Sequence, residues 1–354
     1  MEHYFENLEE KIKHYFHILS EQVPEFLGDY IDTPAMQKLK EIHIICGTYY
    51  SKMYDEMWYS RLDHSVAVAL IIWHFTKNKK QTLAGLFHDI ATPVFSHTID
   101  FMNGDYENQE STEELTTKTI VQSKEIMTLL ERDGIKVEEI DDYHHYPIAD
   151  NDTPQLSSDR LEYTLSNGFG VVKKLWNLDE IQEIYQNIEI QRNEQGMQEL
   201  GFRDIQMAEK FVSTMSTLSM LYRENKTKFS MQFLADCIKK MADKNLITVE
   251  DLYRLSEKEM IEKIENCPED NIAECFKKWK NATKIQENDI PPVGIYSVHI
   301  EKIKIRYINP LVSVSENGFA RVSDVSRQAK QDIEKALRFK TKKYAYLDFE
   351  FTKG

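Results

Sequence analysis

Apolar residues recur at spacings of three and four through almost the whole chain, from residue 4 to about residue 285. In residues 4–21 the pattern runs through Phe5, Leu8, Ile12, Phe16 and Leu19. Residues three and four apart share one face of an α-helix, so this spacing predicts amphipathic helices rather than strands. We expect helices from Pro34 to about residue 45 and over residues 4–21, 64–76, 112–131, 158–165, 177–193, 204–224, 229–244 and 249–263.

The pattern changes after Pro291-Pro292. Val298–Ile308 alternates between two faces and is rich in β-branched residues, which is typical of a strand. Shorter strands are expected at Leu311–Ser315 and Tyr344–Phe351, with a helix at Ser326–Arg338 between them. The predicted fold class is therefore mainly α. We expect a helical core with N-terminal helices over residues 1–195, a helical extension over 196–290 and a small α+β element over 291–354.

Net charge limits the partners that the chain can bind. The 354 residues carry a formal net charge of -15, which argues against nonspecific binding to nucleic acid or to anionic membranes. A local basic pocket for a phosphorylated small molecule remains compatible with it. Because we find neither a signal-peptide pattern nor an apolar run of membrane length, we expect a cytoplasmic protein with no membrane partner. The four cysteines form no C-x-x-C pair and are expected to be free thiols.

The stretch from Thr82 to Asp100 combines apolar residues with a His-Asp pair, His88-Asp89. An imidazole beside a carboxylate is a mixed donor set that suits Zn, Fe, Mn or Ni. His64 and Asp159 also lie at the ends of predicted helices, where ligands from separate helices can meet at one end of a bundle. The alternative is that these four residues are scattered over the surface.

Short motifs then occur in a characteristic order. They are Thr33-Pro34, Ser60–Val66 (SRLDHSV), Leu86–Ile90 (LFHDI) with Phe95-Ser96-His97, and Ser158–Tyr163 (SDRLEY). In this order they resemble the HD-domain phosphohydrolases, and within them the subgroup of deoxynucleoside-triphosphate triphosphohydrolases and their SAM-and-HD-domain relatives. The resemblance covers residues 30–170 with specific motifs and extends more loosely to about residue 265.

The resemblance implies an all-α core and one divalent metal (Zn, Fe, Mn, Ni or Mg) held by His64, His88, Asp89 and Asp159. Metal-bound water would lose a proton near neutral pH and attack phosphorus. Arg61 matches a position that faces the substrate phosphates, although a salt bridge to an acidic neighbour is the alternative. His97 matches an active-site histidine or else makes a structural hydrogen bond. Asp63 is expected either to pack or to orient a ligand, and Asp100 is a further candidate to orient a site residue.

Two departures from the family pattern bear on activity. The family's triphosphohydrolases continue the His-Asp pair with Gly-His-Gly, whereas this chain has Ala91-Thr92-Pro93. A later His-Glu pair is also missing, and its nearest match is Thr112-Glu113. His144, His145 and Glu113 are candidates to replace the missing acid and base groups. The alternatives are a solvated histidine pair and a glutamate that favours a helix start.

We therefore predict a metal-dependent phosphohydrolase that acts on a nucleotide or another small phosphorylated metabolite rather than an ordinary dNTP triphosphohydrolase. The alternative is a catalytically degenerate HD protein that binds a nucleotide or a protein partner as a regulator. The element after residue 291 is expected to act as a homo-oligomer or partner element, or to pack on the helical core as a lid or edge.

Overall fold

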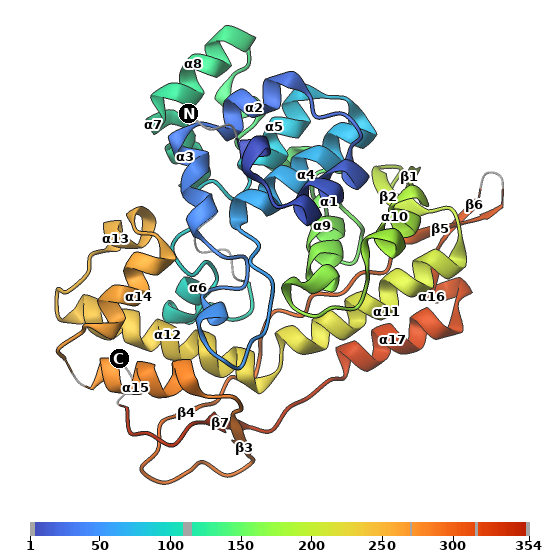
Figure 1. Ribbon diagram of the computed structural model, residues 1–354. Coiled ribbons are helices and arrows are strands. Elements are labelled where there is room, and N and C mark those ends of the chain that lie inside the picture. Colours follow the sequence, from blue (N-terminus) through green and yellow to red (C-terminus); the bar gives the residue numbers. More distant parts are fainter. Residues whose placement is uncertain (1–3, 109–114, 270, 316–317, 352–354) are drawn as a thin grey trace.

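The computed structural model describes residues 4–108, 115–269, 271–315 and 318–351. It is mainly α with a small α+β part, which confirms the predicted fold class. Helices from the first half of the chain, and α10, lie in the upper half of Figure 1. The short helix α6 is the exception and lies below them. Their bounds are α1 (Glu10–Leu19), α2 (Glu25–Ile31), α3 (Pro34–Gln37), α4 (Arg61–Thr76), α5 (Lys79–Phe87), α6 (Thr98–Met102), α7 (Thr116–Gln122), α8 (Lys124–Asp133), α9 (Ser158–Ser166) and α10 (Leu178–Gln186).

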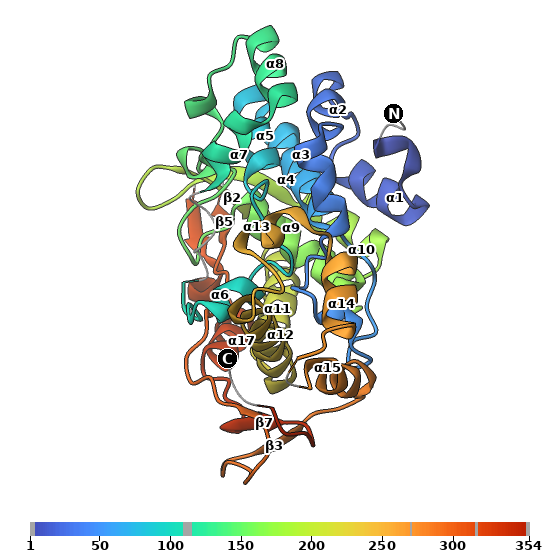
Figure 2. The same cartoon turned by 90° about the vertical axis from the view of Figure 1, so that its left-hand side faces the viewer.

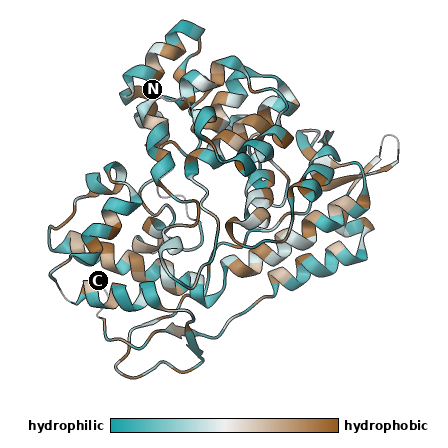
Figure 3. Cartoon of the chain, in the orientation of Figure 1, coloured by the Kyte–Doolittle hydropathy of each residue, from teal (hydrophilic) through white to brown (hydrophobic). Residues whose placement is uncertain are grey.

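Helix α4 is the centre of this half. It begins with a capping box in which Ser60 and Asp63 satisfy each other's backbone N–H groups, which fixes the start of the helix. Its residues from Arg61 to Ile72 are buried except Asp63, so α4 is surrounded by protein on nearly all sides. Figure 3 shows its ribbon largely in the colours of hydrophobic residues. It packs against α5 and α9, and this packing brings the first turn of α4 close to the end of α5 and the start of α9.

The second half of the chain supplies two long helices and a lower group. α11 and α12 follow one another diagonally across the molecule, and α13, α14 and α15 cover the far end of α12 (Figures 1 and 2). The later helices α16 and α17 lie along α11. Their bounds are α11 (Ile205–Tyr222), α12 (Asn225–Asp243), α13 (Val249–Arg254), α14 (Glu257–Glu265), α15 (Ile272–Asn281), α16 (Val322–Val325) and α17 (Arg327–Leu337).

Two small sheets accompany the helices. One has the order β1-β2-β5-β6, with β2 and β5 parallel and the other pairs antiparallel. The other has the antiparallel order β3-β7-β4 and lies at the bottom of Figure 2. Their strands are β1 (Ile188–Arg192), β2 (Gln198–Phe202), β3 (Gln286–Asn288), β4 (Ser297–Val298), β5 (Leu311–Ser315), β6 (Gly318–Arg321) and β7 (Tyr344–Tyr346).

The prediction of one helix over residues 177–193 was wrong in its second half. α10 ends at Gln186, and β1 and β2 form an antiparallel hairpin instead. Ile188 and Ile190 alternate with polar residues, and Gly196 has a positive φ of 77° in the turn, both of which favour a hairpin. The predicted helix over 249–263 is also interrupted, because Ser256 caps the start of a separate helix, α14.

The predicted strand Val298–Ile308 was wrong over most of its length. Only Ser297–Val298 pairs, with β7, and residues 299–310 form no regular element. A strand requires a neighbouring backbone with which to form a ladder. Here the backbone N–H of Lys304 bonds to the carbonyl of Tyr106 and that of Asn309 to the carbonyl of Pro154, and neither partner belongs to a strand. The final strand is likewise shorter than predicted and ends at Tyr346.

The apolar core of the described residues has two large parts and a small third cluster of Val68, Ile72 and Ala149. One large part lies around α4, α5, α9 and α11, and the other around α12, α14 and α15. The predicted three-part division stays a prediction, although residues after 291 contribute to both parts of the core. The four cysteines are buried and free, as expected. Among the described residues, no helix is long and apolar enough to cross a bilayer.

Gly47 supports the loop that precedes α6. Its φ is 76°, and a Cβ there would lie 2.4 Å from Cδ1 of Phe95. Gly104 has the same φ with no atom within 4 Å of such a Cβ. We expect Gly47→Ala to lower the free energy of unfolding by about 1–3 kcal/mol more than Gly104→Ala, because only the first adds a clash to the backbone strain. Urea unfolding of both variants measures the difference, and equal losses would contradict the clash.

Candidate metal centre

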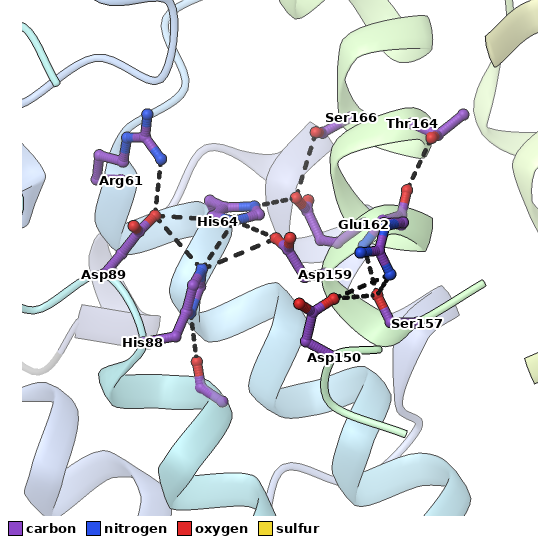
Figure 4. Close-up of polar contacts among 12 residues, drawn as sticks. Arg61, His64, His88, Asp89, Asp150, Ser157, Asp159, Glu162, Thr164 and Ser166 are labelled. Carbon is purple, nitrogen blue, oxygen red and sulfur yellow. Dashed lines mark hydrogen bonds and ion pairs between the residues drawn. The ribbon is translucent and has the colours of Figure 1, made fainter. Parts of the chain in front are cut away.

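Three elements bring the four predicted ligands together. His64 lies in the first turn of α4, His88 and Asp89 directly follow α5, and Asp159 is the second residue of α9 (Figure 4). Ser60 caps α4 as described above, and the Ser157 hydroxyl caps α9 by accepting the N–H of Arg160. The ligands are thus fixed at helix ends, as the sequence suggested.

The donor atoms of these residues converge. His64 Nε2 lies 3.2 Å from His88 Nε2, 3.1 Å from Asp159 Oδ1 and 3.9 Å from Asp89 Oδ2. His88 Nε2 lies 3.4 Å from Asp89 Oδ2 and 3.8 Å from Asp159 Oδ1. Four N and O donors bound tetrahedrally to one ion would be roughly 3.3–3.6 Å apart, given metal–ligand distances of about 2.0–2.2 Å. The observed spacings bracket that range. The donor atoms of His64, His88 and Asp89 all lie within 4.8 Å of one another, so these three residues could hold a metal ion. Asp159 lies beside this group, next to both imidazoles.

Hydrogen bonds set the orientation of both imidazoles. His88 Nδ1 donates to the carbonyl of Gly85 at 2.7 Å, and His64 Nδ1 donates to Oε2 of Glu162. Because a carbonyl or carboxylate can only accept, each ring carries its proton on Nδ1 when neutral and presents Nε2 as a lone pair. Bonding of the second nitrogen in this way is typical of metal-binding histidines.

The charges of the site are mutually dependent. Burial lowers the pKa of His64, but Glu162 and Asp159 outweigh it and raise the pKa to about 10. Burial raises the pKa of Asp159, whereas His64 and His88 outweigh it and lower the pKa to about 2. Without a cation, a proton therefore stays on His64 and balances the carboxylates. A bound cation would take over that role and displace the proton.

Arg61 extends the site beyond the four ligands. Its Nη1 lies 2.7 Å from Asp89 Oδ2, and its Nε donates to Ser96 Oγ at 3.1 Å. Arg61 therefore forms the salt bridge that was one interpretation, and it also lies beside the predicted metal donors. The salt bridge does not exclude the other interpretation, a role in facing the substrate phosphates. Burial raises the pKa of Asp89, but Arg61 and the two histidines outweigh it and hold the pKa below its ordinary value.

A large cavity opens onto these residues. Its volume is about 1310 Å³, and Arg61, all four predicted ligands, His97 and His144 line it. His97 Nδ1 lies 2.9 Å from Oδ2 of Asp100, which is buried. Burial lowers the pKa of His97; the bond to Asp100 opposes this, while Arg306 and Arg61 lower the pKa further. His97 therefore combines the predicted structural hydrogen bond with a position on the cavity wall.

The remaining candidates lie in different places. His144 lies on the cavity wall between Asp142, 2.9 Å from its Nδ1, and Asp150, 3.4 Å from its Nε2. His145 is exposed and points its Nε2 to Asp142 at 3.6 Å. Glu113 lies outside the described residues. The structure thus brings His144 to the cavity that the predicted ligands line, and leaves His145 in contact with Asp142 at the surface.

The residue that replaces the family's histidine contacts a ligand. Thr92 Oγ1 donates to Asp89 Oδ1 at 3.3 Å, and Lys38 Nζ donates to the Thr92 carbonyl at 3.3 Å. Asp63, which the sequence suggested as an orienting residue, accepts bonds from Ser60 and from the hydroxyl of Tyr4 instead.

Sequence reasoning missed Glu162 and Arg306. Glu162 is fully buried and bonds to His64. Because it follows Asp159 by three residues on α9, helical spacing was a signal that could have found it. Arg306 lines the cavity from the irregular segment 299–310, and the chain carries no local signal for that placement.

Comparisons with known proteins agree on the fold. No protein-family model matches the chain. The uncharacterized protein YdhJ of Bacillus subtilis (strain 168) is 25% identical over 328 residues, which cover 91% of this chain and 94% of YdhJ. A hypothetical protein from Aquifex aeolicus superposes with a TM-score of 0.61 and 19% identity, covering 92% of this chain and 93% of that one. A phosphohydrolase from Bacteroides thetaiotaomicron gives 0.63 and 14%, covering 93% and 97%. The chain shares its fold with these structures over nearly its full length.

Proposed function

We propose that the chain is a metal-dependent phosphohydrolase of the HD type, acting on a nucleotide or another small phosphorylated compound. The convergence of His64, His88, Asp89 and Asp159 on the wall of a large cavity carries this proposal. Two further observations support it. The motifs resemble those of HD-domain phosphohydrolases, and a protein described as a phosphohydrolase shares the fold.

The donor set fits a divalent transition metal such as Zn, Fe, Mn or Ni, because two imidazoles and two carboxylates are mixed N/O ligands; Mg is the remaining alternative. When bound, such an ion polarises a phosphoryl oxygen and lowers the pKa of water. The chain supplies the other roles. The Arg61 guanidinium lies beside Asp89 and is suited to bind phosphate oxygens.

His97 is the residue placed to move a proton. Asp100 holds its Nδ1–H, so Nε2 is available to accept a proton at the cavity wall. Its lowered pKa favours the neutral, proton-accepting form at neutral pH. His144, held between two carboxylates, is the candidate to donate a proton to the leaving group in place of the missing histidines.

The cavity favours a nucleotide over a small sugar phosphate. Small-molecule sites usually measure about 300–1,000 Å³, and this cavity exceeds that range at about 1310 Å³. Tyr143, Tyr163, Phe169 and Tyr222 line it, and aromatic side chains are the residue type on which a base can stack. Basic residues line it as well, although the chain as a whole is acidic.

A phosphate-release screen over nucleotides and sugar phosphates tests the proposal when combined with elemental analysis of the purified protein. We expect about one equivalent of a divalent metal, release from at least one compound, and loss of release after chelation with recovery on adding metal. Full activity in metal-stripped protein would exclude the proposal. Metal and nucleotide binding without phosphate release from any compound would favour the degenerate regulator. That alternative is considered because Thr92 stands where the HD-domain triphosphohydrolases have a histidine.

A further inference from the structure

The irregular segment 299–310 forms part of the cavity wall. Its backbone is held at two points, since Lys304 N donates to the carbonyl of Tyr106 at 2.9 Å and Asn309 N to the carbonyl of Pro154 at 2.8 Å. Residues Ile303 to Arg306, around the first of these points, line the cavity that contains the predicted metal ligands. A segment far along the chain from the HD-like motifs therefore contributes to the same cavity.

Arg306 is placed among residues from three other elements. Its charge acts on His97 before α6, on Tyr163 in α9 and on Tyr222 at the end of α11. All three of these residues line the cavity. The guanidinium thus belongs to the wall of the cavity rather than to the outer surface of the segment.

His97 lies within the field of two guanidinium groups. Burial lowers its pKa first, and both Arg306 and Arg61 lower it further. Arg61 is the arginine beside the metal ligands, at 2.7 Å from Asp89. Arg61, Arg306 and His97 all line the one cavity, so an anionic group near Arg61 and a second one near Arg306 would share that cavity with His97.

Other lysines at the cavity add to its positive charge. Lys173, Lys174, Lys226 and Lys304 line it from three separate parts of the chain. Eight lysines and arginines and seven carboxylates line the cavity, whereas the chain overall carries 44 basic and 59 acidic residues. The cavity is thus less acidic than the chain as a whole. Cavities lined by cations concentrate anionic ligands.

We propose that Arg306 binds a second anionic group of the substrate, a phosphate that is not the one held at the metal centre. This inference rests on the proposed function and deepens it. It makes a compound with two or more phosphates, rather than a simple phosphomonoester, the preferred ligand. The planar guanidinium suits this role because it can donate two parallel hydrogen bonds to one phosphate.

Equilibrium binding tests the assignment without requiring turnover. Inorganic pyrophosphate and orthophosphate are titrated calorimetrically into the metal-loaded protein, and elemental analysis after titration confirms that the metal is retained. In Arg306→Gln we expect the Kd for pyrophosphate to rise at least tenfold, with a change of less than threefold for orthophosphate. Arg306→Lys should recover part of the loss, because it keeps the charge without the bidentate geometry.

Lys302→Gln is the matched control, because Lys302 lies in the same segment with its side chain 76% exposed. It should leave the Kd for both anions within twofold of the wild-type values. Equal weakening of both anions in Arg306→Gln, no weakening of either, or failure of the wild-type protein to bind pyrophosphate would overturn the role of Arg306. Tight pyrophosphate binding that depends on Arg306 in a protein that hydrolyses nothing would refute the proposed function alone.

Discussion

Replacing His88 with alanine should remove the bound metal and lower phosphate release by about 10³-fold or more. His88 Nε2 faces His64, Asp89 and Asp159 within 3.8 Å, so its loss removes one of four converging donors. Metal ions contribute several kcal/mol of transition-state stabilisation, and about 1.4 kcal/mol corresponds to a tenfold change in rate. Elemental analysis and the initial rate of phosphate release measure the two effects.

The control for this variant is His17→Ala. His17 is an exposed histidine on α1, so its replacement removes an imidazole without touching the site. It should keep the wild-type metal content and rate. A far-ultraviolet circular dichroism spectrum and an unfolding midpoint for His88→Ala show whether the fold is retained. A folded His88→Ala protein that keeps both its metal and its rate would rule out the proposed metal centre.

Glu162→Ala is expected to have the largest effect on stability. Glu162 is fully buried and accepts hydrogen bonds from Tyr59 at 2.7 Å, from Tyr15 at 3.2 Å and from Nδ1 of His64. Removing the carboxylate leaves these donors buried without a partner. Breaking a buried charged pair by deleting one member costs about 3–5 kcal/mol, and we expect a loss of that size in urea unfolding.

The same change should weaken metal binding. Groups that orient a metal-binding histidine typically contribute about 10- to 100-fold in metal affinity, and Glu162 is the group that fixes His64 Nδ1. Competition with a chelator of known affinity measures the difference. Glu162→Gln, which keeps the volume and an acceptor, should lose less stability than Glu162→Ala. Glu183→Ala, at an exposed position on α10, should change neither quantity, and an equal loss in that variant would contradict the assigned role.

The metal-centre residues could be predicted because their signals are local. His64, His88, Asp89 and Asp159 each occur in a short motif at a helix end, and the apolar spacing located those helices. Their convergence then follows from the packing of α4 against α5 and α9. Whether the assigned roles are correct remains a prediction for the variants above.

Other features could not be predicted because they depend on distant contacts. The segment 299–310 has the alternation of a strand, but the structure gives it no neighbouring strand over most of its length. Alternation of apolar and polar residues indicates that a segment has two different faces. It does not indicate whether a neighbouring strand is present to pair with its backbone. β1 shows the opposite case, because the apolar spacing of its residues predicted a helix where the structure has a hairpin of β1 and β2. β5 pairs with β2 from more than a hundred residues further along the chain. The cavity position of Arg306 likewise depends on how the whole chain folds.

The wall formed by residues 303–306 has a consequence for the order in which the site is completed. A ribosome makes Asp159, the last of the four proposed ligands, 144 residues before it makes Ile303. A growing chain therefore possesses every proposed ligand long before the cavity has its final wall. Nascent chains that stop short of residue 303 carry these residues without the enclosure, so the complete pocket can form only late in synthesis.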